Sequence, residues 1–209
     1  IPDVDHYNLK NAEGKLNVEF LQSEAELYES CDNGDTWKMV SNCKMPYKIF
    51  SDGLQEPGIE ELSDGRLYAI FRNNSGRFFE AYSSDGGRGW TTPAPSRFVG
   101  PPAPMCKRKL KNGKIVFIYN PIPLHYGNGE FRSGIWTGGR NPYVIRLADG
   151  ALNELGEIKE LENDDSRGFS YCAAYELDGE LLLAYCAGGA EDKMMLNRLR
   201  IKKVKLSEL

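Results

Sequence analysis

The sequence predicts an all-β fold, a β-propeller built from repeated antiparallel sheets. Its apolar runs are short, such as IVFIY at 115–119 and LLLAY at 181–185, and no long helical periodicity occurs. Asp-Gly or Asn-Gly pairs separate such runs, and these pairs favour hairpin turns because glycine adopts positive φ readily. The glycines at 65 and 113 are 48 residues apart, which is about the length of one propeller blade.

Three units repeat the same order, a hairpin followed by a further strand. The hairpins are EELSDGRLYAIFRN, KRKLKNGKIVFIYN and AAYELDGELLLAYC, and the later strands are RFFEAYSS, NPYVIRLA and LNRLRIKKVKL. The turn pairs lie at 64–65, 112–113, 149–150 and 178–179. Residues 13–37 resemble one more such unit. The 121–139 stretch, PIPLHYGNGEFRSGIWTGG, reads as a glycine-rich insertion, and long loops on a rigid scaffold often carry function.

Composition excludes several classes of function. The net charge of −4 and the pI near 5.4 argue against a nucleic-acid partner, which needs a basic surface. No apolar run approaches the roughly 20 residues of a membrane span. Five cysteines without a C-x-x-C pair, together with two histidines, predict no metal site, and we expect no cofactor. No signal peptide is visible, and both a secreted and a cytoplasmic location stay open.

One motif, S-x-D-x-G-x-x-W, occurs twice, at 30–37 and at 83–90. An aspartate in such a turn accepts hydrogen bonds from nearby backbone N–H groups, and glycine permits positive φ. The tryptophan covers the turn and anchors it on the sheet. We therefore assign a structural role to the eight motif residues, Ser30, Asp32, Gly34, Trp37, Ser83, Asp85, Gly87 and Trp90.

These motifs resemble the Asp box of sialidases and of related proteins with bacterial neuraminidase repeats. A longer resemblance covers roughly residues 28–205 and keeps the family's order of elements. It includes QEPGIEELSDGRLYAIFRN before the second Asp box, GRNPYVIRL after the insertion, and GFSYCAAYELDGELLLAYC. The resemblance implies a propeller of the sialidase type, six-bladed when complete. Residues 1–209 would then be one domain of about four blades, lacking its N-terminal blades.

Transferred residue by residue, the resemblance implies four site positions. Glu56 matches the glutamate that pairs with the family's tyrosine, and Tyr171 matches that tyrosine, the nucleophile. Arg72 and Arg140 match two arginines of the triad that grips the substrate carboxylate. The first arginine of the triad and the acid/base aspartate have no match in this chain, and we expect them in the missing blades.

Two alternatives compete with this assignment. Phe169 fits the tyrosine position in another alignment, which would leave no nucleophile. Arg146 is the fallback for Arg140, although its spacing from Val144 and Leu147 suggests the outside of a strand.

The residue types suit a sialic acid, which carries a carboxylate on its anomeric carbon. Guanidinium groups bind carboxylates bidentately, so several arginines fix the orientation of the sugar. A carboxylate nucleophile would be repelled by that charge, whereas a neutral tyrosine is not, and the sialidase tyrosine is a known exception to the two-carboxylate rule. Because free tyrosine has a pKa near 10, a neighbouring glutamate must take its proton during attack.

The sequence therefore favours an enzyme, a sialidase-like exo-glycoside hydrolase with a retaining mechanism and a glycan or sialoside as its substrate. His125 and Tyr126, on the insertion, are further candidates for contact with the substrate. Three alternatives stay open: a glycan-binding propeller without catalysis, a structural or interaction module, and a related glycosidase that acts on another sugar.

Overall fold

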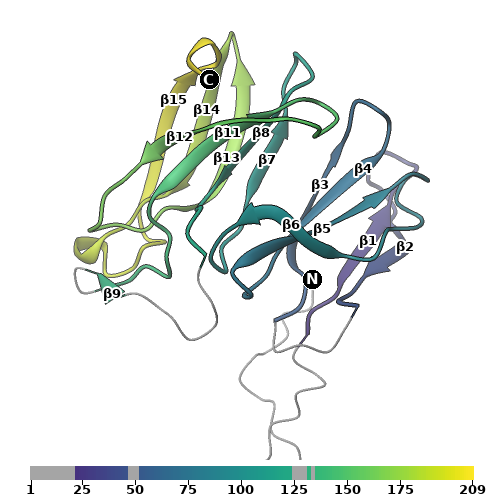
Figure 1. The fold of residues 1–209 in the computed structure, drawn as a ribbon, viewed down its shortest axis with the longest axis horizontal. Helices are drawn as coiled ribbons and strands as arrows, with labels where there is room; N and C mark the ends of the chain where they lie inside the picture. The colour runs from purple at the N-terminus through teal and green to yellow at the C-terminus, as the bar shows by residue number, and fades with distance from the viewer. Residues whose placement is uncertain (1–21, 47–51, 124–130, 133–134) are drawn as a thin grey trace, which may run out of the picture.

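The computed structural model describes residues 22–46, 52–123, 131–132 and 135–209, and this part of the chain is almost entirely β (Figure 1). The only helices among these residues are two three-residue 3-10 turns, Ala190–Asp192 and Leu206–Glu208. The first strands are β1 (Ala25–Glu29), β2 (Lys38–Cys43), β3 (Gln55–Glu61), β4 (Leu67–Arg72), β5 (Arg77–Ser83), β6 (Ala94–Val99), β7 (Cys106–Lys109) and β8 (Ile115–Tyr119). The others are β9 (Phe131–Arg132), β10 (Ile135–Trp136), β11 (Tyr143–Ala148), β12 (Leu155–Glu162), β13 (Ser170–Leu177), β14 (Glu180–Cys186) and β15 (Leu199–Lys205).

The strands form four successive antiparallel sheets, which we call sheets I to IV. Sheet I is β1-β2, sheet II is β3-β4-β5-β6, sheet III is β7-β8-β11-β12 and sheet IV is β13-β14-β15. Strands β9 and β10 pair separately within the 121–139 insertion. The first strands of sheets II, III and IV pack against one another, β3 on β7 and β7 on β13. Sheets II to IV therefore share one inner edge.

The core consists of three hydrophobic clusters, one between each pair of consecutive sheets. Strand β8 shows how a short apolar run can contribute to two hydrophobic clusters at once. Ile115 and Phe117 pack toward sheet II, whereas Val116 and Ile118 pack toward sheet IV. All residues of β8 are buried, because the side chains of a strand alternate between two faces and both faces are covered. The run IVFIY is apolar at every position because both of its faces are buried.

The predicted hairpins are confirmed, but one turn differs in detail. Gly65, Gly113 and Gly179 adopt positive φ between paired strands. At the fourth turn, β11 and β12 pair as expected, yet the residue with positive φ is Leu152 rather than Gly150. A longer loop accounts for the shift, since six residues separate the two strands and the reversal of direction falls later in the loop.

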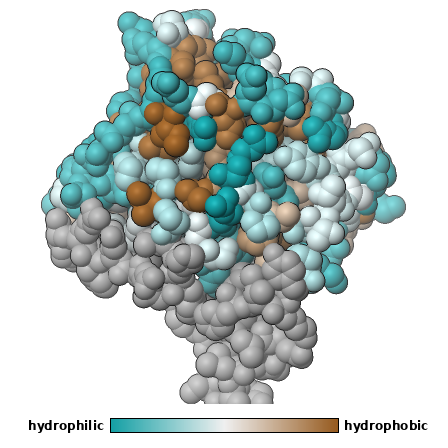
Figure 2. Space-filling view, in the orientation of Figure 1, coloured by the Kyte–Doolittle hydropathy of each residue, from teal (hydrophilic) through white to brown (hydrophobic). Residues whose placement is uncertain are grey.

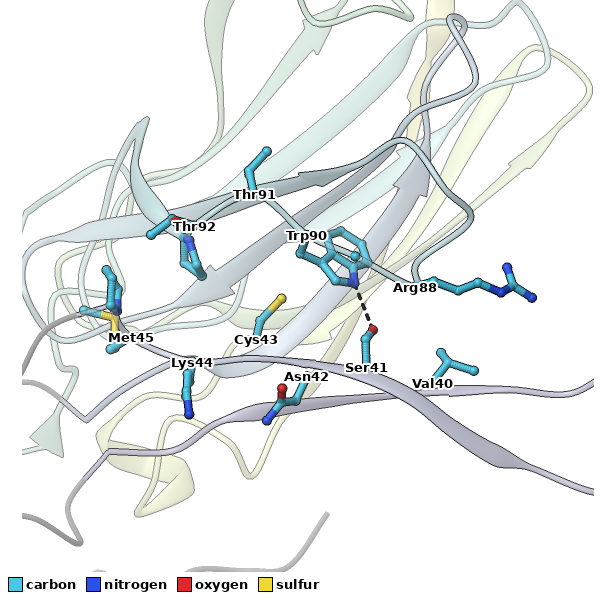
Figure 3. Close-up of a pocket in the computed structure, with 13 residues that line it drawn as sticks. Val40, Ser41, Asn42, Cys43, Lys44, Met45, Arg88, Trp90, Thr91 and Thr92 are labelled. Carbon is cyan, nitrogen blue, oxygen red and sulfur yellow. Dashed lines mark hydrogen bonds between the residues drawn. The ribbon is translucent and has the colours of Figure 1, made fainter.

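Both S-x-D-x-G-x-x-W segments fold into the same hydrogen-bonded turn. In the second, Ser83 Oγ donates to Asp85 Oδ1 over 2.8 Å and accepts from the backbone N–H of Gly87 over 2.9 Å. The indole N–H of Trp90 donates to the carbonyl of Gly87 over 3.0 Å. It also lies 3.1 Å from Ser41 Oγ, which belongs to β2 of sheet I (Figure 3).

The first turn repeats these bonds. Ser30 Oγ donates to Asp32 Oδ1 over 2.8 Å and accepts from the N–H of Gly34 over 2.8 Å. The indole N–H of Trp37 donates to the carbonyl of Gly34 over 3.0 Å. The two turns occupy the same place in their sheets, between β1 and β2 and between β5 and β6. By this comparison β1 and β2 correspond to the last two strands of sheet II.

Apolar side chains reach the surface on the two outermost sheets of the described part. On sheet IV, Tyr175 is 58 % exposed and Ile201 is 71 % exposed; Leu199, beside them, is also exposed. On sheet I and its turn, Tyr28 and Trp37 are exposed. Figure 2 shows brown, hydrophobic residues at the surface among hydrophilic ones on one face of the molecule.

The all-β class and the antiparallel, repeated sheets are thus confirmed. Figure 1 shows the described sheets side by side without closing into a ring, so the number of blades stays a prediction. No helix in the described ranges is long and apolar enough to cross a membrane.

Candidate functional site

Two backbone irregularities at the inner edge bring Glu56 and Tyr171 together. Each residue lies near the start of the first strand of its sheet, where the strand register shifts, Glu56 in β3 and Tyr171 in β13. Both have positive φ, 44° and 56° respectively, which is unusual and strained for residues other than glycine. β-Bulges redirect side chains and are common beside active sites. The irregularities here direct two side chains that are 115 positions apart toward one point.

The carboxylate of Glu56 is the centre of the cluster. The hydroxyl of Tyr171 donates to Glu56 Oε1 over 3.0 Å, and Arg72 Nη1 donates to the same oxygen over 2.9 Å. Arg72 ends β4 and pairs with Gln55, the residue before Glu56. The strand pairing of β3 with β4 therefore holds the ion pair in place. Tyr171 as a whole residue stays 43 % exposed, so a ligand can reach it.

Arg140 approaches Tyr171 from the segment between β10 and β11. Its guanidinium carbon lies 5.5 Å from the centre of the Tyr171 ring, in the range of a cation–π contact. The guanidinium donates to Ser170 Oγ over 3.2 Å and to the carbonyl of Pro102 over 3.4 Å. The backbone carbonyl of Arg140 accepts from the N–H of Phe169 over 2.7 Å. Arg140 is thus fixed to the start of β13 by both its backbone and its side chain.

The two arginines make the site electropositive. Arg140 is only 4 % exposed, and burial lowers its pKa, with the nearby charge of Arg72 lowering that pKa further. Two guanidinium groups meet only one carboxylate in the cluster formed by Arg72, Arg140, Glu56 and Tyr171, so one positive charge is uncompensated there. The Nε atoms of both arginines are buried without a hydrogen-bond partner among the described residues. Buried donors without partners are costly, and an anionic ligand would satisfy this charge.

The arrangement is chemically specific. A neutral phenol lies against a carboxylate that can accept its proton, and a positive surface adjoins both groups. Such a site can orient an anion and present an oxygen nucleophile to the atom next to its charge. In the described part of the chain, no group of three or more His, Cys, Asp or Glu residues could hold a metal ion.

The structure separates the alternatives that the sequence left open. Phe169 is fully buried in the cluster between sheets III and IV, where its ring stacks on Tyr143, so it does not reach the cluster at Glu56. Arg146 lies on β11 and donates to the carbonyl of Gly156 over 2.6 Å. Arg140, not Arg146, contacts Tyr171. His125 and Tyr126 lie outside the described residues.

Two contributors to the site were not predicted from the sequence. Ser170 and the carbonyl of Pro102 hold the guanidinium of Arg140. Ser170 stands directly before Tyr171 in the sequence, and this position was the only available signal. Pro102 carries no signal, because a backbone carbonyl acts here through its position alone.

A separate cavity of about 510 Å³ opens between residues 40–46 and 88–93 (Figure 3). Strand β2 and the segment 88–93 line it, with Lys44, Arg88 and Trp90 among the lining residues. None of the four residues of the cluster at Glu56 lines this cavity. It is the space between sheet I and the second Asp-box turn, and it holds no pairing of a nucleophile with a base.

The repeated antiparallel sheets and the two S-x-D-x-G-x-x-W turns define an all-β repeat protein. The sequence matches the BNR repeat-like domain family over residues 21–183, and the chain belongs to that family. The resemblance to proteins with bacterial neuraminidase repeats is thereby confirmed. A comparison with curated protein sequences gave no match.

Solved structures with the same fold include several glycosidases. The leech intramolecular trans-sialidase is 21 % identical, with a TM-score of 0.62 over 88 % of this chain and 28 % of its own. The Trypanosoma rangeli sialidase is 14 % identical, with a TM-score of 0.62 over 88 % of this chain and 27 % of its own. The Penicillium chrysogenum α-L-arabinanase is 15 % identical, with a TM-score of 0.55 over 85 % and 52 %. The chain spans about a quarter to a half of the length of these proteins.

Proposed function

We propose that this chain is part of a sialidase-like exo-glycoside hydrolase that removes terminal sialic acid, or a related acidic sugar, from glycans. One observation carries the proposal: the hydroxyl of Tyr171 donates to Glu56 at the inner edge, beside two arginines with unsatisfied buried donors. The family and the fold agree with this activity, since two of the solved structures above are a trans-sialidase and a sialidase.

The proposed reaction retains configuration at the anomeric carbon. Arg72 and Arg140 hold the sugar carboxylate, and the oxygen of Tyr171 attacks the anomeric carbon while Glu56 takes the phenolic proton. The bond to the leaving oxygen breaks, and that oxygen receives a proton from an acid outside the four residues. Water then attacks the anomeric carbon, giving one proton to the now deprotonated acid outside the four residues, and the tyrosyl–sugar bond breaks. Glu56 returns the phenolic proton to the departing oxygen of Tyr171.

Further blades would supply the missing acid and the first arginine of the triad. Two features support them: the apolar faces of sheets I and IV are uncovered among the described residues, and the described sheets do not close into a ring (Figure 1). A complete ring of six blades would cover both faces. The fragment alone is then expected to lack hydrolytic activity.

The decisive experiment measures release from a fluorogenic sialoside by the protein that includes these blades. Tyr171→Phe removes only the nucleophilic oxygen, so kcat should fall about 10³-fold or more. Tyr175→Phe is the matched control, because Tyr175 lies on the same strand, is 58 % exposed and is not a member of the cluster. Equal activity of wild type and Tyr171→Phe would refute the nucleophile.

A covalent probe tests the mechanism independently. The T. rangeli sialidase was solved as a covalent intermediate with 2,3-difluorosialic acid. The same compound should add to Tyr171, detected as a mass increase on the peptide that contains this residue. Addition to another residue, or to none while hydrolysis continues, would contradict the proposed intermediate.

The arabinanase fold makes a neutral sugar the second candidate substrate. Two arginines with unsatisfied donors favour an anion instead, because a neutral sugar leaves their charge uncompensated. Parallel assays with sialoside and arabinoside substrates separate the two. Turnover of the arabinoside alone would assign the site to a neutral sugar, and binding without turnover of either would indicate a glycan-binding propeller.

A further inference from the structure

Two cysteines from neighbouring sheets meet directly beside Tyr171. Cys106 begins β7 of sheet III, and Cys172 is the residue after Tyr171 in β13 of sheet IV. Strands β7 and β13 pack against each other at the inner edge. The thiols of Cys106 and Cys172 lie close enough for each to shift the pKa of the other, and both are free. The thiol of Cys172 donates to the backbone carbonyl of Ala173 over 3.3 Å. No local pattern predicts this pair, since 65 residues separate the two cysteines.

The position of the pair leaves it reachable. Both thiols pack on the margin of the hydrophobic cluster between sheets III and IV, and both are partly rather than fully buried. Tyr143, which is fully buried, lies next to them on the core side. A small reagent can therefore approach from the inner edge, whereas the other side is closed by the core.

The surroundings favour one thiol as the nucleophile. The interaction with Cys172 lowers the pKa of Cys106 against the opposing effect of burial; the positive charges of Lys107 and Arg108 lower it further, whereas the negative charge of Glu60 raises it. The Lys107 side chain points to the opposite face of β7 and lies over Gly58 of sheet II, where a Cβ atom would come within 1.4 Å of Nζ, so its charge acts on Cys106 across the strand. The thiolate is the reactive form of cysteine, so Cys106 is the first to react.

We propose that Cys106 and Cys172 form a thiol–disulfide exchange site that accepts low-molecular-weight disulfides such as oxidised glutathione. The thiolate of Cys106 attacks one sulfur of the disulfide and releases one glutathione thiolate. Cys172 then loses its proton and attacks the Cys106 sulfur, which releases the second glutathione. The two protein thiols are oxidised by two electrons to one disulfide, and oxidised glutathione is reduced to two glutathione molecules.

Oxidation of the two thiols affects the site at Glu56 because it moves the irregular start of β13. Tyr171 and Cys172 both lie where the register of β13 shifts, between the pairs Ser170–Cys186 and Ala173–Ala184. A covalent bond brings two sulfur atoms closer than a hydrogen bond does, so oxidation draws this segment toward β7. The hydrogen bond from Tyr171 to Glu56 is then displaced. This consequence rests on the proposed function, whereas the exchange reaction does not.

The test is peptide mapping under non-reducing conditions after incubation in glutathione buffers of increasing oxidising strength, with free thiols blocked by alkylation. We expect one intramolecular disulfide, between the peptides that contain Cys106 and Cys172. Cys31, which is exposed, serves as the internal reference and should carry only glutathione. If Cys106 and Cys172 stay free, or each carry glutathione, when Cys31 is fully modified, the proposal is overturned.

Two substitutions sharpen the result. In Cys172→Ser the reaction should stop at the mixed disulfide between Cys106 and glutathione, because the second thiol is absent. Cys186→Ser is the matched control: its side chain alternates with those of Leu183 and Tyr185, which face the core, and so lies on the opposite face of sheet IV. It should leave the disulfide unchanged. Loss of the disulfide in Cys186→Ser would contradict the assignment of the pair.

Activity measurements test the coupling to Tyr171. In the protein with its additional blades, oxidation should lower sialoside turnover at least fivefold, and dithiothreitol should restore it. Cys106→Ser should keep the activity of the reduced protein and become insensitive to oxidation. A disulfide that forms without changing turnover would refute the coupling. Absence of turnover in every redox state would count against the proposed function, and peptide mapping would still decide the exchange site.

Discussion

The two Asp-box turns of this protein have nearly identical internal hydrogen bonds but differ in how far their tryptophans are buried. Each binds its serine, aspartate and glycine in the same pattern, and each tryptophan donates to the carbonyl of the glycine three residues earlier. Trp37 is nevertheless 63 % exposed, whereas Trp90 is partly buried and packs on the cluster between sheets I and II. The indole of Trp90 also reaches Ser41 on sheet I. The hydrogen bonds are local, and the burial comes from the neighbouring sheet.

This difference teaches what an Asp box does in such a fold. The turn closes two strands of its own sheet without outside help. Its tryptophan then joins that sheet to the preceding one when a preceding sheet is present. For Trp37, no described residue takes the role that Ser41 has for Trp90.

Replacement of each tryptophan by alanine should give the largest difference in stability between the two turns. Trp90→Ala removes packing between sheets and should lower the free energy of unfolding by about 2–3 kcal/mol, below the range for fully buried tryptophans because Trp90 is only partly buried. Trp37→Ala should cost less than about 1 kcal/mol, because surface changes have small effects. Urea unfolding of both variants checks the order. Equal losses would show that the burial of Trp90 contributes nothing.

The hydrogen bonds between Ser41 and the second Asp-box turn should account for a smaller part of the free energy of unfolding than the burial of Trp90 does. Ser41 Oγ donates to the carbonyl of Gly87 over 2.5 Å and accepts from the Trp90 indole. Ser41→Ala removes both bonds and should cost about 1 kcal/mol. Asn42→Ala, on the same strand, loses only an exposed bond to Glu24 and should cost less than about 0.5 kcal/mol. A larger loss for Asn42→Ala would reverse the interpretation, again in urea unfolding.

The glycines inside the turns should behave alike. Gly34 and Gly87 have φ of 99° and 88°, and a Cβ atom at either would make only ordinary contacts. The cost of an alanine is therefore backbone strain, about 1 kcal/mol at each position. Thermal or urea unfolding should give the same loss for Gly34→Ala and Gly87→Ala within about 0.5 kcal/mol. A clear difference would mean that the neighbouring sheet also shapes the turn.

The aspartates should show the smallest effect, as a dependence on pH. The hydroxyl and N–H of Thr36 lower the pKa of Asp32 to about 2, and the N–H of Gly89 and the hydroxyl of Ser83 lower the pKa of Asp85. A folded pKa below the unfolded value of about 3.9 stabilises the fold above that pH. The contribution of Asp32 is then lost as the pH falls toward about 2. Carboxyl NMR titration checks both values, and a midpoint at or above 3.9 would contradict the hydrogen bonding.

Much of the fold could be predicted from the sequence because its signals are local. Strand β8 needed only an apolar run, and the hairpins at Gly65, Gly113 and Gly179 needed only their turn pairs. The shift of positive φ from Gly150 to Leu152 was not predictable, since loop length rather than the Asp-Gly pair decided it. The number of blades depends on contacts beyond the described sheets and stays a prediction.

The candidate site was predictable only by resemblance. The segments QEPG and GFSY identify Glu56 and Tyr171 as candidates, but nothing local requires them to meet. Their meeting depends on a register shift at the start of β3 and of β13, and on the packing of both strands against β7. The choice of Tyr171 over Phe169 is likewise tertiary, because Phe169 faces the core.

The sequence by itself determined the strands, the turns at Gly65, Gly113 and Gly179 and the repeated order of the sheets, because backbone conformation and alternation of side chains depend on neighbouring residues. Only the tertiary structure decided which tryptophan is buried, which aromatic residue faces Glu56, and that Cys106 meets Cys172. Each of these depends on a contact between different sheets. Such contacts are set by the stacking of whole sheets, which no short segment encodes.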